Sequence, residues 1–543
     1  MTTAWHTTLL LAAAGTLATA FAVWRAGRRQ VFFLHMAQLE GYKVAPFAAW
    51  VTGRMFDVVL RWSHAVGTLL LVILVVLKPT GPALAGLFSA WAVAFMSSRR
   101  YRRDRPKKAL AWTPRMKRLA VTSVLVTLLV STFVAAALSS HPPLALLAFL
   151  LAADLLAPVA VATALAVNVP LERRVHQGFI RQAQTRLAHR PDLGIVAITG
   201  SYGKTSTKFA IREMLSQRHP VLASPGSFNT PMGICRVVNN MLEDDHRWLV
   251  LEMGTRHSGD ITALCEIARP DIAVVTSVGK AHLATMGSVE AIAREKGSLL
   301  RFLPRGGTAI LNWDDKHVAS MRAEEDVHYI YVSAAGHEEA DIRAENVRYD
   351  ACGCAFDVVF RRDRVRIETR LLGAHNITNM LLALAVGHAS GLTLRQMAPA
   401  FRRLQPVPHR LELRHDPGGL TVLDDAFNSN PVGARSAVDV LSHFTSGQRI
   451  VITPGMVELG AVEEEENRAW GAYMALRVDT VVLVGADRTR PIAEGLRRAG
   501  FPDEGIVTVR TLFDARAWLT RNAKPGDTVL YENDLPDQYT EAS

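Results

Sequence analysis

Hydrophobic and polar residues are arranged differently in two parts of this chain. Before about residue 170 apolar residues form long runs, and beyond it they form short runs separated by polar turns. Runs long enough to cross a bilayer predict transmembrane helices, so we expect about five spans in residues 1–170. The five runs are Thr8 to Trp24, Ala65 to Leu77, Ala83 to Met96, Leu119 to Leu138 and Leu144 to Val169. The second and third are short, and a re-entrant hairpin and two tilted helices both fit them.

Short apolar runs beyond residue 194 predict an α/β body. Ile195 to Ile198 has the composition of a buried parallel strand, and Lys208 to Leu215 that of the helix after it. Alternating runs between Tyr329 and Leu372 predict a small β-rich part. Strands that alternate with helical segments predict a Rossmann-like C-terminal domain, and they are Thr421 to Leu423, Arg449 to Ile452, Thr480 to Val484 and Thr528 to Tyr531.

Composition favours a membrane region joined to a soluble body. The chain has 543 residues, too many for one core, and 49% of them are hydrophobic. The net charge is +11, and the densest basic block lies between the third and fourth apolar runs, at Arg99 to Arg118. Basic loops face the cytoplasm, so we expect a multi-pass protein of the bacterial inner membrane with its soluble body in the cytoplasm. The sequence contains no aromatic-basic surface motif of the kind that binds nucleic acid, so we expect no nucleic-acid partner.

Two polar features adjoin the apolar runs. Asp154 is an acid inside the fifth run, where a functional role, a side chain that snorkels to the membrane surface and a misplaced span boundary all fit. Residues 171–193 carry several arginines among spaced apolar residues, which predicts a basic amphipathic linker helix on the inner membrane face.

The four cysteines lack the paired spacing of a zinc site, and we expect them to be reduced thiols.

The first strand of the body leads into Thr199-Gly-Ser-Tyr-Gly-Lys-Thr-Ser206, which has the residues of a phosphate-binding loop. Gly200 and Gly203 allow backbone N–H groups to surround phosphate oxygens. Lys204 would neutralise the terminal phosphate, and the Thr205 hydroxyl would hold Mg²⁺. Gly200 stands closer to Lys204 than the first glycine of the usual signature does, so the loop is a shortened one.

Two later strands also lead into polar residues that suit metal chemistry. The run from Trp248 ends in Glu252, and the run from Asp271 is followed by His282. Neighbouring parallel strands place such residues at the same edge of a sheet, where Mg²⁺ ligands and water-orienting groups are found. We therefore expect Glu252 and His282 beside the phosphate-binding loop.

These motifs, in this order, resemble the Mur ligase family, most of all its MurF branch, from about Gly194 to Asp527. They are Leu251-Glu-Met-Gly254, Ala281-His-Leu283, Glu295-Lys-Gly297, Leu311-Asn-Trp-Asp-Asp315, Gly373-Ala-His-Asn-Ile-Thr-Asn379, Pro408-His-Arg-Leu-Glu412 and Asp424-Asp-Ala-Phe-Asn-Ser-Asn-Pro431. The resemblance implies an ATP-dependent carbon–nitrogen ligase. Its P-loop central domain would be residues 194–407 and its Rossmann-like C-terminal domain residues 408–543, after the transmembrane region and the linker.

The resemblance also implies which residues form the site. The ATP phosphates would be bound by Gly200, Ser201, Gly203, Lys204, Thr205 and Ser206. Two Mg²⁺ ions would be bound by Thr205, Glu252, His282 and Lys296, the last as a carbamate. Asn376 and Asn379 would lie on the adenine side, and Arg410 and Asp425 would reach from the last domain to the phosphate and the ribose. Catalysis would depend on Lys204, Lys296, His282 and Asn229.

The chemistry of amide synthesis agrees with these roles. Joining a carboxylate to an amine in water is uphill, so ATP must first convert the carboxylate to an acyl phosphate. Cations between the two anions stabilise that transfer, and with Lys204 they stabilise the oxyanion that forms when the amine attacks. A side-chain nucleophile is not required.

Three departures from the family pattern leave the substrates open. Few residues lie between the last apolar run and Gly194, which leaves no room for the uridine-binding domain of soluble relatives. Tyr531-Glu-Asn-Asp-Leu-Pro536 stands where the family has Lys-Gly-Ser, and Gly455 stands where an aspartate is expected.

Two classes of function therefore remain. One is a membrane-bound ligase that joins an amino acid or dipeptide to a cell-wall precursor carboxylate, lipid-linked or nucleotide-linked, or that makes another amide polymer such as poly-glutamate. The other is a non-synthetic membrane ATPase or nucleotide sensor on a ligase scaffold. The joint presence of His282, Lys296, Asn379 and Arg410 favours the ligase, because a sensor has less need of a second metal site.

Overall fold

The computed structural model divides the chain into two compact units, Met1–Val175 and His176–Ser543. The described residues are 2–60, 62–77, 91, 109–140, 142–226, 228–279, 281, 283–350, 353–426, 429–457 and 459–534. Each unit contains clusters of buried apolar side chains of its own.

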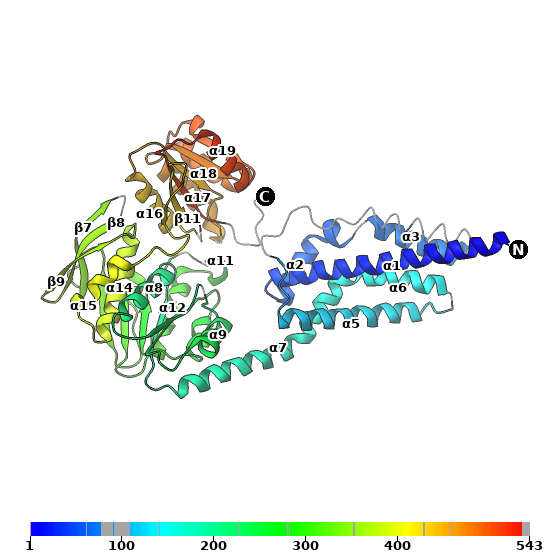
Figure 1. Ribbon diagram of the computed structural model, residues 1–543, viewed down its shortest axis with the longest axis horizontal. Coiled ribbons are helices and arrows are strands. Elements are labelled where there is room, and N and C mark those ends of the chain that lie inside the picture. The colour runs from blue at the N-terminus through cyan, green and yellow to red at the C-terminus, as the bar shows by residue number, and fades with distance from the viewer. Residues whose placement is uncertain are drawn as a thin grey trace. The chain divides into compact units, whose positions relative to one another are not determined.

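The described part of the first unit is helical (Figure 1, blue to cyan). Its elements are α1 (Thr2–Leu39), α2 (Val44–Gly53), the π-helix η1 (Met55–Val59), α3 (Trp62–Leu77), α5 (Pro114–Ala136), α6 (Pro142–Leu155) and the first part of α7 (Ala157–Ala188). Helix α6 packs against α1, α3 and α5. Ala22, Leu70 and Leu147 are among the buried residues between these helices, so apolar contacts hold the unit together.

A group of charged side chains is buried inside this helical unit. Asp154 of α6 is fully buried, and its Oδ2 accepts a hydrogen bond from Arg25 of α1 at 3.3 Å. The same oxygen lies 2.7 Å from Nε2 of His64 in α3. Arg25 also donates to the Ser63 hydroxyl at 3.0 Å. Ion pairing within the unit therefore accounts for an acid in an apolar run.

The prediction of a multi-pass membrane region with about five spans is wrong. Among the described residues only α5 is long and apolar enough to cross a membrane, with a second span only if the bent pair α6 and α7 is counted as one. Helix α3 has 16 residues, and at 1.5 Å per residue it reaches roughly 24 Å of a hydrocarbon layer roughly 30 Å thick. Because α6 and α7 meet at a bend of 62°, Leu144 to Val169 is not one straight span.

The predicted localisation in the bacterial inner membrane depended on the five spans, and it is therefore also wrong. A core helix of a soluble protein passes the same test of length and composition, so α5 alone does not place the chain in a membrane. The expected span from Ala83 to Met96 lies outside the described residues apart from Trp91, as does the part of the basic block at 99–108. Helix α7 continues through Pro170 into the residues that were expected to begin a separate linker helix.

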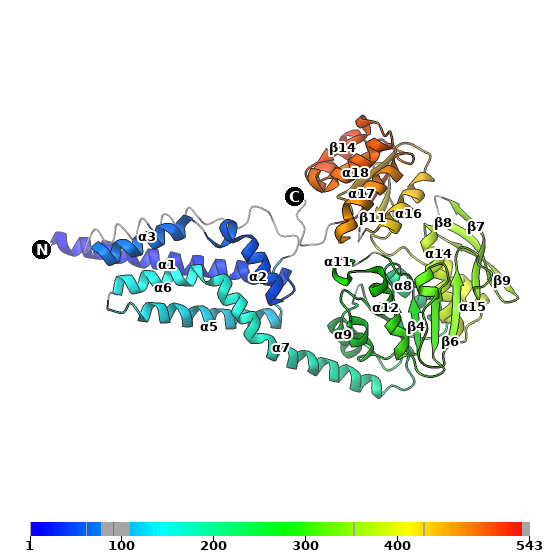
Figure 2. The same ribbon diagram turned by 180° about the vertical axis from the view of Figure 1, so that it is seen from behind.

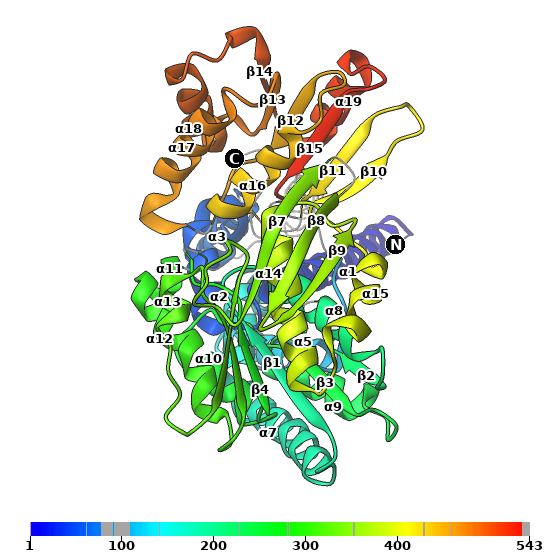
Figure 3. The ribbon, with the colours of Figure 1, turned by 90° about the vertical axis from the view of Figure 1, so that its left-hand side faces the viewer.

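The second unit is built on two sheets, which Figure 3 shows one above the other. The strands of the first sheet are β1 (Gly194–Thr199), β2 (Val221–Ala223), β3 (Trp248–Glu252), β4 (Ile272–Val275), β5 (Thr308–Asn312), β6 (His328–Ser333), β7 (Ile342–Asp350), β8 (Gly353–Phe360) and β9 (Asp363–Thr369). Its helices are α8 (Lys204–Leu215), α9 (Pro231–Met241), α10 (Asp260–Cys265), α11 (Leu283–Met286), α12 (Val289–Gly297), η2 (Ser298–Phe302), α13 (Lys316–Ala319), α14 (Ala374–Ala389) and α15 (Leu394–Arg403).

The first sheet has the strand order β2-β3-β1-β4-β5-β6-β7-β8-β9, and β1 to β6 pair in parallel. Strands β7 to β9 extend it with antiparallel pairs, as the alternating runs between Tyr329 and Leu372 predicted. Helices α8, α14 and α15 cover one face, while α9, α10 and the end of α7 cover the other (Figure 2). Strand β1 is thus buried on both faces, and its carboxyl end meets those of β3 and β4 at one edge.

The second sheet has the order β10-β11-β15-β12-β13-β14, in which only β10 is antiparallel among the described strands. Its elements are β10 (Glu412–His415), β11 (Thr421–Asp425), α16 (Pro431–Ser442), β12 (Arg449–Thr453), η3 (Gly460–Val462), α17 (Glu463–Met474), β13 (Thr480–Val484), α18 (Ala486–Arg498), η4 (Asp503–Gly505), β14 (Ile506–Val509), α19 (Leu512–Asn522) and β15 (Thr528–Glu532). Helices α16 to α18 cover one face and α19 the other. Both sheets are mostly parallel, which agrees with the expected α/β class.

Removing the buried carboxylate of the first unit should destabilise that unit. In Asp154→Ala, Arg25 and His64 lose a buried anionic partner, and breaking such a pair costs about 3–5 kcal/mol. We expect faster amide hydrogen exchange in α1, α3 and α6. As a control, Asp503→Ala removes an exposed ion pair with Arg497, which is worth less than about 1 kcal/mol. Equal exchange in the two variants would show that the buried cluster does not stabilise the unit.

Candidate active site

The loop between β1 and α8 is closed around two glycines. Gly200 and Gly203 have φ angles of +152° and +81°, which side chains rarely adopt. A Cβ at Gly200 would lie 1.9 Å from the Thr276 hydroxyl, and one at Gly203 would lie 2.5 Å from Oδ1 of Asn379. Only glycine therefore fits at either position.

A second loop, residues 276–279 after β4, supports the glycine loop from beside it. The Ser201 N–H donates to the Ser277 carbonyl at 2.7 Å, and the Gly279 N–H donates to the Ser201 hydroxyl at 2.8 Å. Asp315, which follows β5, accepts a hydrogen bond from the Val278 N–H at 2.7 Å. Three successive strand ends thus hold the glycine loop in one shape.

Helix α8 begins at Lys204, directly after the glycine loop. The first N–H groups of a helix have no partner inside it and carry partial positive charge, so they attract an anion. The Lys204 ammonium lies over the loop, where it donates to the Gly200 carbonyl at 2.7 Å. An anion at this point would meet both the helix end and the lysine.

Glu252, at the end of β3, connects the predicted catalytic residues. Its Oε2 accepts a hydrogen bond from the Thr205 hydroxyl at 2.8 Å, and its Oε1 accepts one from the Asn229 amide at 3.1 Å. Burial alone would raise the pKa of Glu252, but Lys204 and Lys208 hold that pKa below its ordinary value. Glu252 is therefore a buried, ionised oxygen donor beside the Thr205 hydroxyl, as a Mg²⁺ site requires.

Lys208 is a site residue that the sequence reasoning missed. Its side chain is fully buried, and its ammonium lies 3.3 Å from Oε2 of Glu252 and 2.5 Å from the Gly226 carbonyl. It thereby joins helix α8 to strand β3 and to the loop that carries Asn229. The spacing could have revealed it, because Lys208 stands four residues after Lys204 on the same face of the helix.

Lys296 lies near the end of α12 and is only 2% exposed. Burial, together with the nearby Lys204 charge, lowers its pKa well below the ordinary value for lysine. The preceding residue, Glu295, accepts hydrogen bonds from the N–H groups of Gly259 and Ile261 at 2.9 Å each, which fixes α12 against α10. His282, the other predicted metal ligand, lies outside the described residues.

Two asparagines of α14 have different positions. Asn379 accepts a hydrogen bond from the Thr207 hydroxyl at 3.0 Å and lines the main cavity of the second unit. Asn376 lies behind it, where its Oδ1 accepts from the Asn379 amide at 3.2 Å and its own amide donates to the Leu372 carbonyl at 2.7 Å. Asn376 thus orients Asn379 from the protein side.

The main cavity has a volume of about 1120 Å³. It is lined by predicted site residues from both sheets of the unit, namely Gly203, Ser206, Asn379, Arg410 and Asp425. It is also lined by residues that the sequence reasoning did not assign, among them Asn312, His375, Arg435 and Glu466. The cavity therefore extends from the glycine loop to the strand ends of the second sheet.

These residues fit a nucleoside triphosphate with a divalent cation. The glycine loop leaves a space that any Cβ would fill, and the helix end and Lys204 supply positive charge beside it. Thr205 and Glu252 supply hydroxyl and carboxylate oxygens, which are the ligands that Mg²⁺ prefers. The cavity beyond Gly203 has room for the nucleoside.

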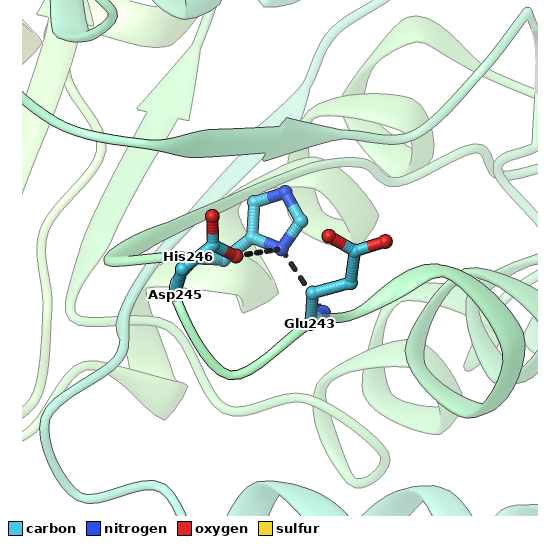
Figure 4. Close-up of side chains that lie close together, drawn as sticks. All are labelled: Glu243, Asp245 and His246. Carbon is cyan, nitrogen blue, oxygen red and sulfur yellow. Dashed lines mark hydrogen bonds and ion pairs between the residues drawn. The ribbon is translucent and has the colours of Figure 1, made fainter.

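A separate group of acidic and histidine side chains, Glu243, Asp245 and His246, lies in the turn between α9 and β3 (Figure 4). Nδ1 of His246 already accepts a hydrogen bond from the Glu243 N–H at 3.0 Å. Arg190 donates to the carbonyls of Glu243 and His246. These contacts explain the grouping as a braced surface turn.

Comparison with known proteins agrees with this geometry. Residues 198–387 match the Mur ligase middle domain, and residues 409–531 match the Mur ligase, glutamate ligase domain. The UDP-N-acetylmuramoyl-tripeptide--D-alanyl-D-alanine ligase of Mycobacterium tuberculosis (strain ATCC 25618 / H37Rv) is 34% identical over 359 residues, which cover 62% of this chain and 70% of that protein. The chain belongs to the Mur ligase family. Like the family, it is an ATP-dependent ligase.

Further relatives and solved structures support the predicted resemblance to the MurF branch of the family. The ligase of the same name from Escherichia coli (strain K12) is 30% identical, over 60% of this chain and 73% of that protein. Among solved structures, MurF from Acinetobacter baumannii has a TM-score of 0.60 at 24% identity, covering 67% of this chain and 79% of that one. MurF ligase from Thermotoga maritima in complex with ADP has a TM-score of 0.59 at 23% identity, covering 67% and 81%. These two likenesses show the shared fold.

Removing the Lys208 ammonium should impair this Mur ligase. In Lys208→Met, Glu252 loses a buried cationic partner and the Asn229 loop loses its tie to α8, so we expect kcat/KM for ATP to fall on the order of a hundredfold. Steady-state ADP release measures the change. Lys524→Met, an exposed lysine of the second sheet's domain, should retain the rate of the unchanged enzyme. Full activity of Lys208→Met would contradict the role assigned to Lys208.

Proposed function

We propose that this ligase joins D-alanyl-D-alanine to the terminal carboxylate of a muramyl tripeptide at the expense of ATP. The observation that carries the proposal is the arrangement of Thr205 and Asn229 on the Glu252 carboxylate, directly beside Lys204 and the glycine loop. The identity of 30–34% to ligases named for these substrates supports the choice of acceptor and amine. The catalytic parts would be residues 194–407 and 408–543, preceded by a linker at 171–193.

Each residue of the site has a task in this reaction. Lys204 and the first turn of α8 would bind and neutralise the terminal phosphate, as their positions over the glycine loop allow. Arg410 would bind phosphate from the far side of the cavity, and Asp425 would accept a hydrogen bond from the ribose. Asn379 would contact the adenine side, held in place by Asn376.

The amine attack requires residues that stabilise negative charge on the substrate. Mg²⁺, when bound, supplies Lewis acid chemistry that lowers repulsion between the carboxylate and the phosphate. Thr205 and Glu252 would hold one ion, and His282 with Lys296 would hold a second. Asn229, fixed by Glu252, would orient the reacting carboxylate, and Lys204 would stabilise the oxyanion.

Lys296 would serve as a metal ligand after it reacts with CO₂. Burial and the nearby Lys204 charge lower the pKa of Lys296 well below its ordinary value, which favours the neutral amine over the ammonium. The neutral nitrogen forms a bond to the CO₂ carbon and releases a proton to solvent. The product is a carbamate anion, which offers oxygen to Mg²⁺, whereas an ammonium offers none.

The acceptor is tested by presenting the muramyl tripeptide in two forms, linked to UDP and linked to a lipid diphosphate. ADP release by the full chain should require the acceptor and D-alanyl-D-alanine together, and the more active form identifies the natural carrier. Release that needs neither compound would favour an ATPase or nucleotide sensor and would end the proposal. Release that needs glutamate instead of D-alanyl-D-alanine would favour a polymer-forming ligase.

Replacing Lys296 tests the carbamate directly. Protein equilibrated with ¹³C-labelled bicarbonate should give a carbamate carbon signal by NMR, and Lys296→Ala should lose both this signal and amine-dependent ADP release. Lys524→Met should keep both. A Lys296→Ala enzyme with normal amine-dependent turnover would refute the assignment.

A further inference from the structure

Two carboxyl groups face each other at the ends of neighbouring strands in the second sheet. Strands β11 and β15 are parallel, and their register pairs Asp425 with Glu532. Residues paired in this way project from the same face of a sheet. Asp425 lines the main cavity, whereas Glu532 is 1% exposed and lies behind it. The two side chains are within hydrogen-bonding reach of each other.

Of the two carboxyl oxygens of Glu532, one has a hydrogen-bond donor among the described residues and the other has none. Its Oε1 accepts a hydrogen bond from the Ser429 hydroxyl at 2.6 Å. Its Oε2 has no donor among the described residues. Asn533 follows with a φ of +72° and braces the site, since its amide donates to the Gly455 carbonyl at 2.6 Å and its oxygen accepts from the Ser429 N–H at 3.2 Å.

Oε2 of Glu532 is buried without a donor among the described residues and lies next to the carboxyl group of Asp425. This arrangement is stable when one of the two carboxyl groups carries a proton. Two carboxylates in such a place repel each other and lack water, so one of them stays protonated. Burial and the neighbouring Asp425 raise the pKa of Glu532 well above its ordinary value. Burial also raises the pKa of Asp425, to about 6, against the opposing charge of Arg410. The proton therefore belongs to Glu532 near neutral pH, and Asp425 is ionised.

Asp425 has a second contact that matters for the cavity. Its Oδ1 accepts a hydrogen bond from the Leu411 N–H at 3.0 Å, directly after Arg410. His409 and Leu411 both have positive φ angles, +60° and +49°, which cost strain in residues other than glycine. Asp425 thus helps to hold the strained turn that directs Arg410 into the cavity.

We propose that Glu532 is a positioning residue that, as a neutral acid, donates a hydrogen bond to Asp425 and keeps this carboxylate ionised and turned toward the cavity. The proposal rests on the proposed function, in which Asp425 accepts a hydrogen bond from the nucleotide ribose. A lysine at this position could donate to Asp425 but could not accept from Ser429. A charged glutamate could accept from Ser429 but could not donate to Asp425. Glu532 would therefore set the pH range over which the nucleotide binds.

The charged groups around Asp425 come from three elements. Arg410 faces it from the turn before β10, Asp424 precedes it on β11, and Glu532 lies on β15. Asp424 in turn contacts His409 at 2.9 Å and Arg414 at 3.2 Å. Protonation of Asp425 below about pH 6 removes an acceptor for the ribose hydroxyl, so binding should weaken as the pH falls through that value.

The test measures ADP binding to the full chain by calorimetry between pH 5 and pH 8. Glu532→Gln keeps one acceptor for Ser429 and one N–H donor for Asp425, so we expect affinity at neutral pH within about threefold of the unchanged protein and the same acid limb. Glu532→Met has the same length but no donor. We expect about tenfold weaker binding and loss of binding at a higher pH, because ionised Asp425 is less well stabilised.

The outcomes separate this inference from the function on which it rests. If the unchanged protein binds no ADP at any pH, the proposed nucleotide site is wrong and the inference fails with it. If ADP binds normally but Glu532→Met keeps the native pH profile, Glu532 has no positioning role. A Glu532→Gln profile displaced to lower pH would show that native Glu532 carries a charge, which also overturns the proposal. Glu504→Gln, an exposed change in the same domain, should leave the profile unaltered.

Discussion

The ion pairing of one buried carboxylate, Glu252, determines how the site is assembled. It holds Thr205 of α8, Asn229 of a loop and the ammonium of Lys208 around the end of β3. Lys204 and Lys208 together outweigh its single negative charge, so this part of the pocket attracts anions. A phosphate chain would supply the missing negative charge, and a cation beside Glu252 would then offset the excess. We therefore expect binding of the phosphate chain to favour binding of the cation, and binding of the cation to favour that of the phosphate chain.

Much of the second unit could be predicted because burial and local pattern agree there. Strand β1 is covered on both faces, so its residues form an uninterrupted apolar run that is easily recognised. The glycine loop and the strand-end acid follow such runs, and a parallel sheet brings strand ends together. For that reason Lys204, Thr205 and Glu252 were expected together and lie together. Asn379, Arg410 and Asp425 were also expected near one another, and all three line the cavity.

Other features could not be predicted, because a pattern of apolar residues indicates that side chains avoid water. It does not indicate whether lipid or other parts of the protein surround them. The described long runs before residue 170 form helices that bend, stop short or pack on one another, and Asp154 pairs with Arg25 and His64, which lie far away in the chain. Lys208 and Glu532 were missed for a related reason. Each is a charged residue type in a fully buried place, and its partner, Glu252 for Lys208 and Ser429 for Glu532, lies far away in the chain.

The close approach of Gly203 to Asn379 has a consequence for how such a sequence can change over time. A Cβ at residue 203 would collide with the asparagine amide, and that amide is itself held by Thr207 and Asn376. A single replacement at either position therefore breaks contacts that a second replacement cannot easily restore. Positions 203, 207, 376 and 379 should behave as one inherited unit, lost or kept together among descendants of this protein, although they stand far apart in the gene.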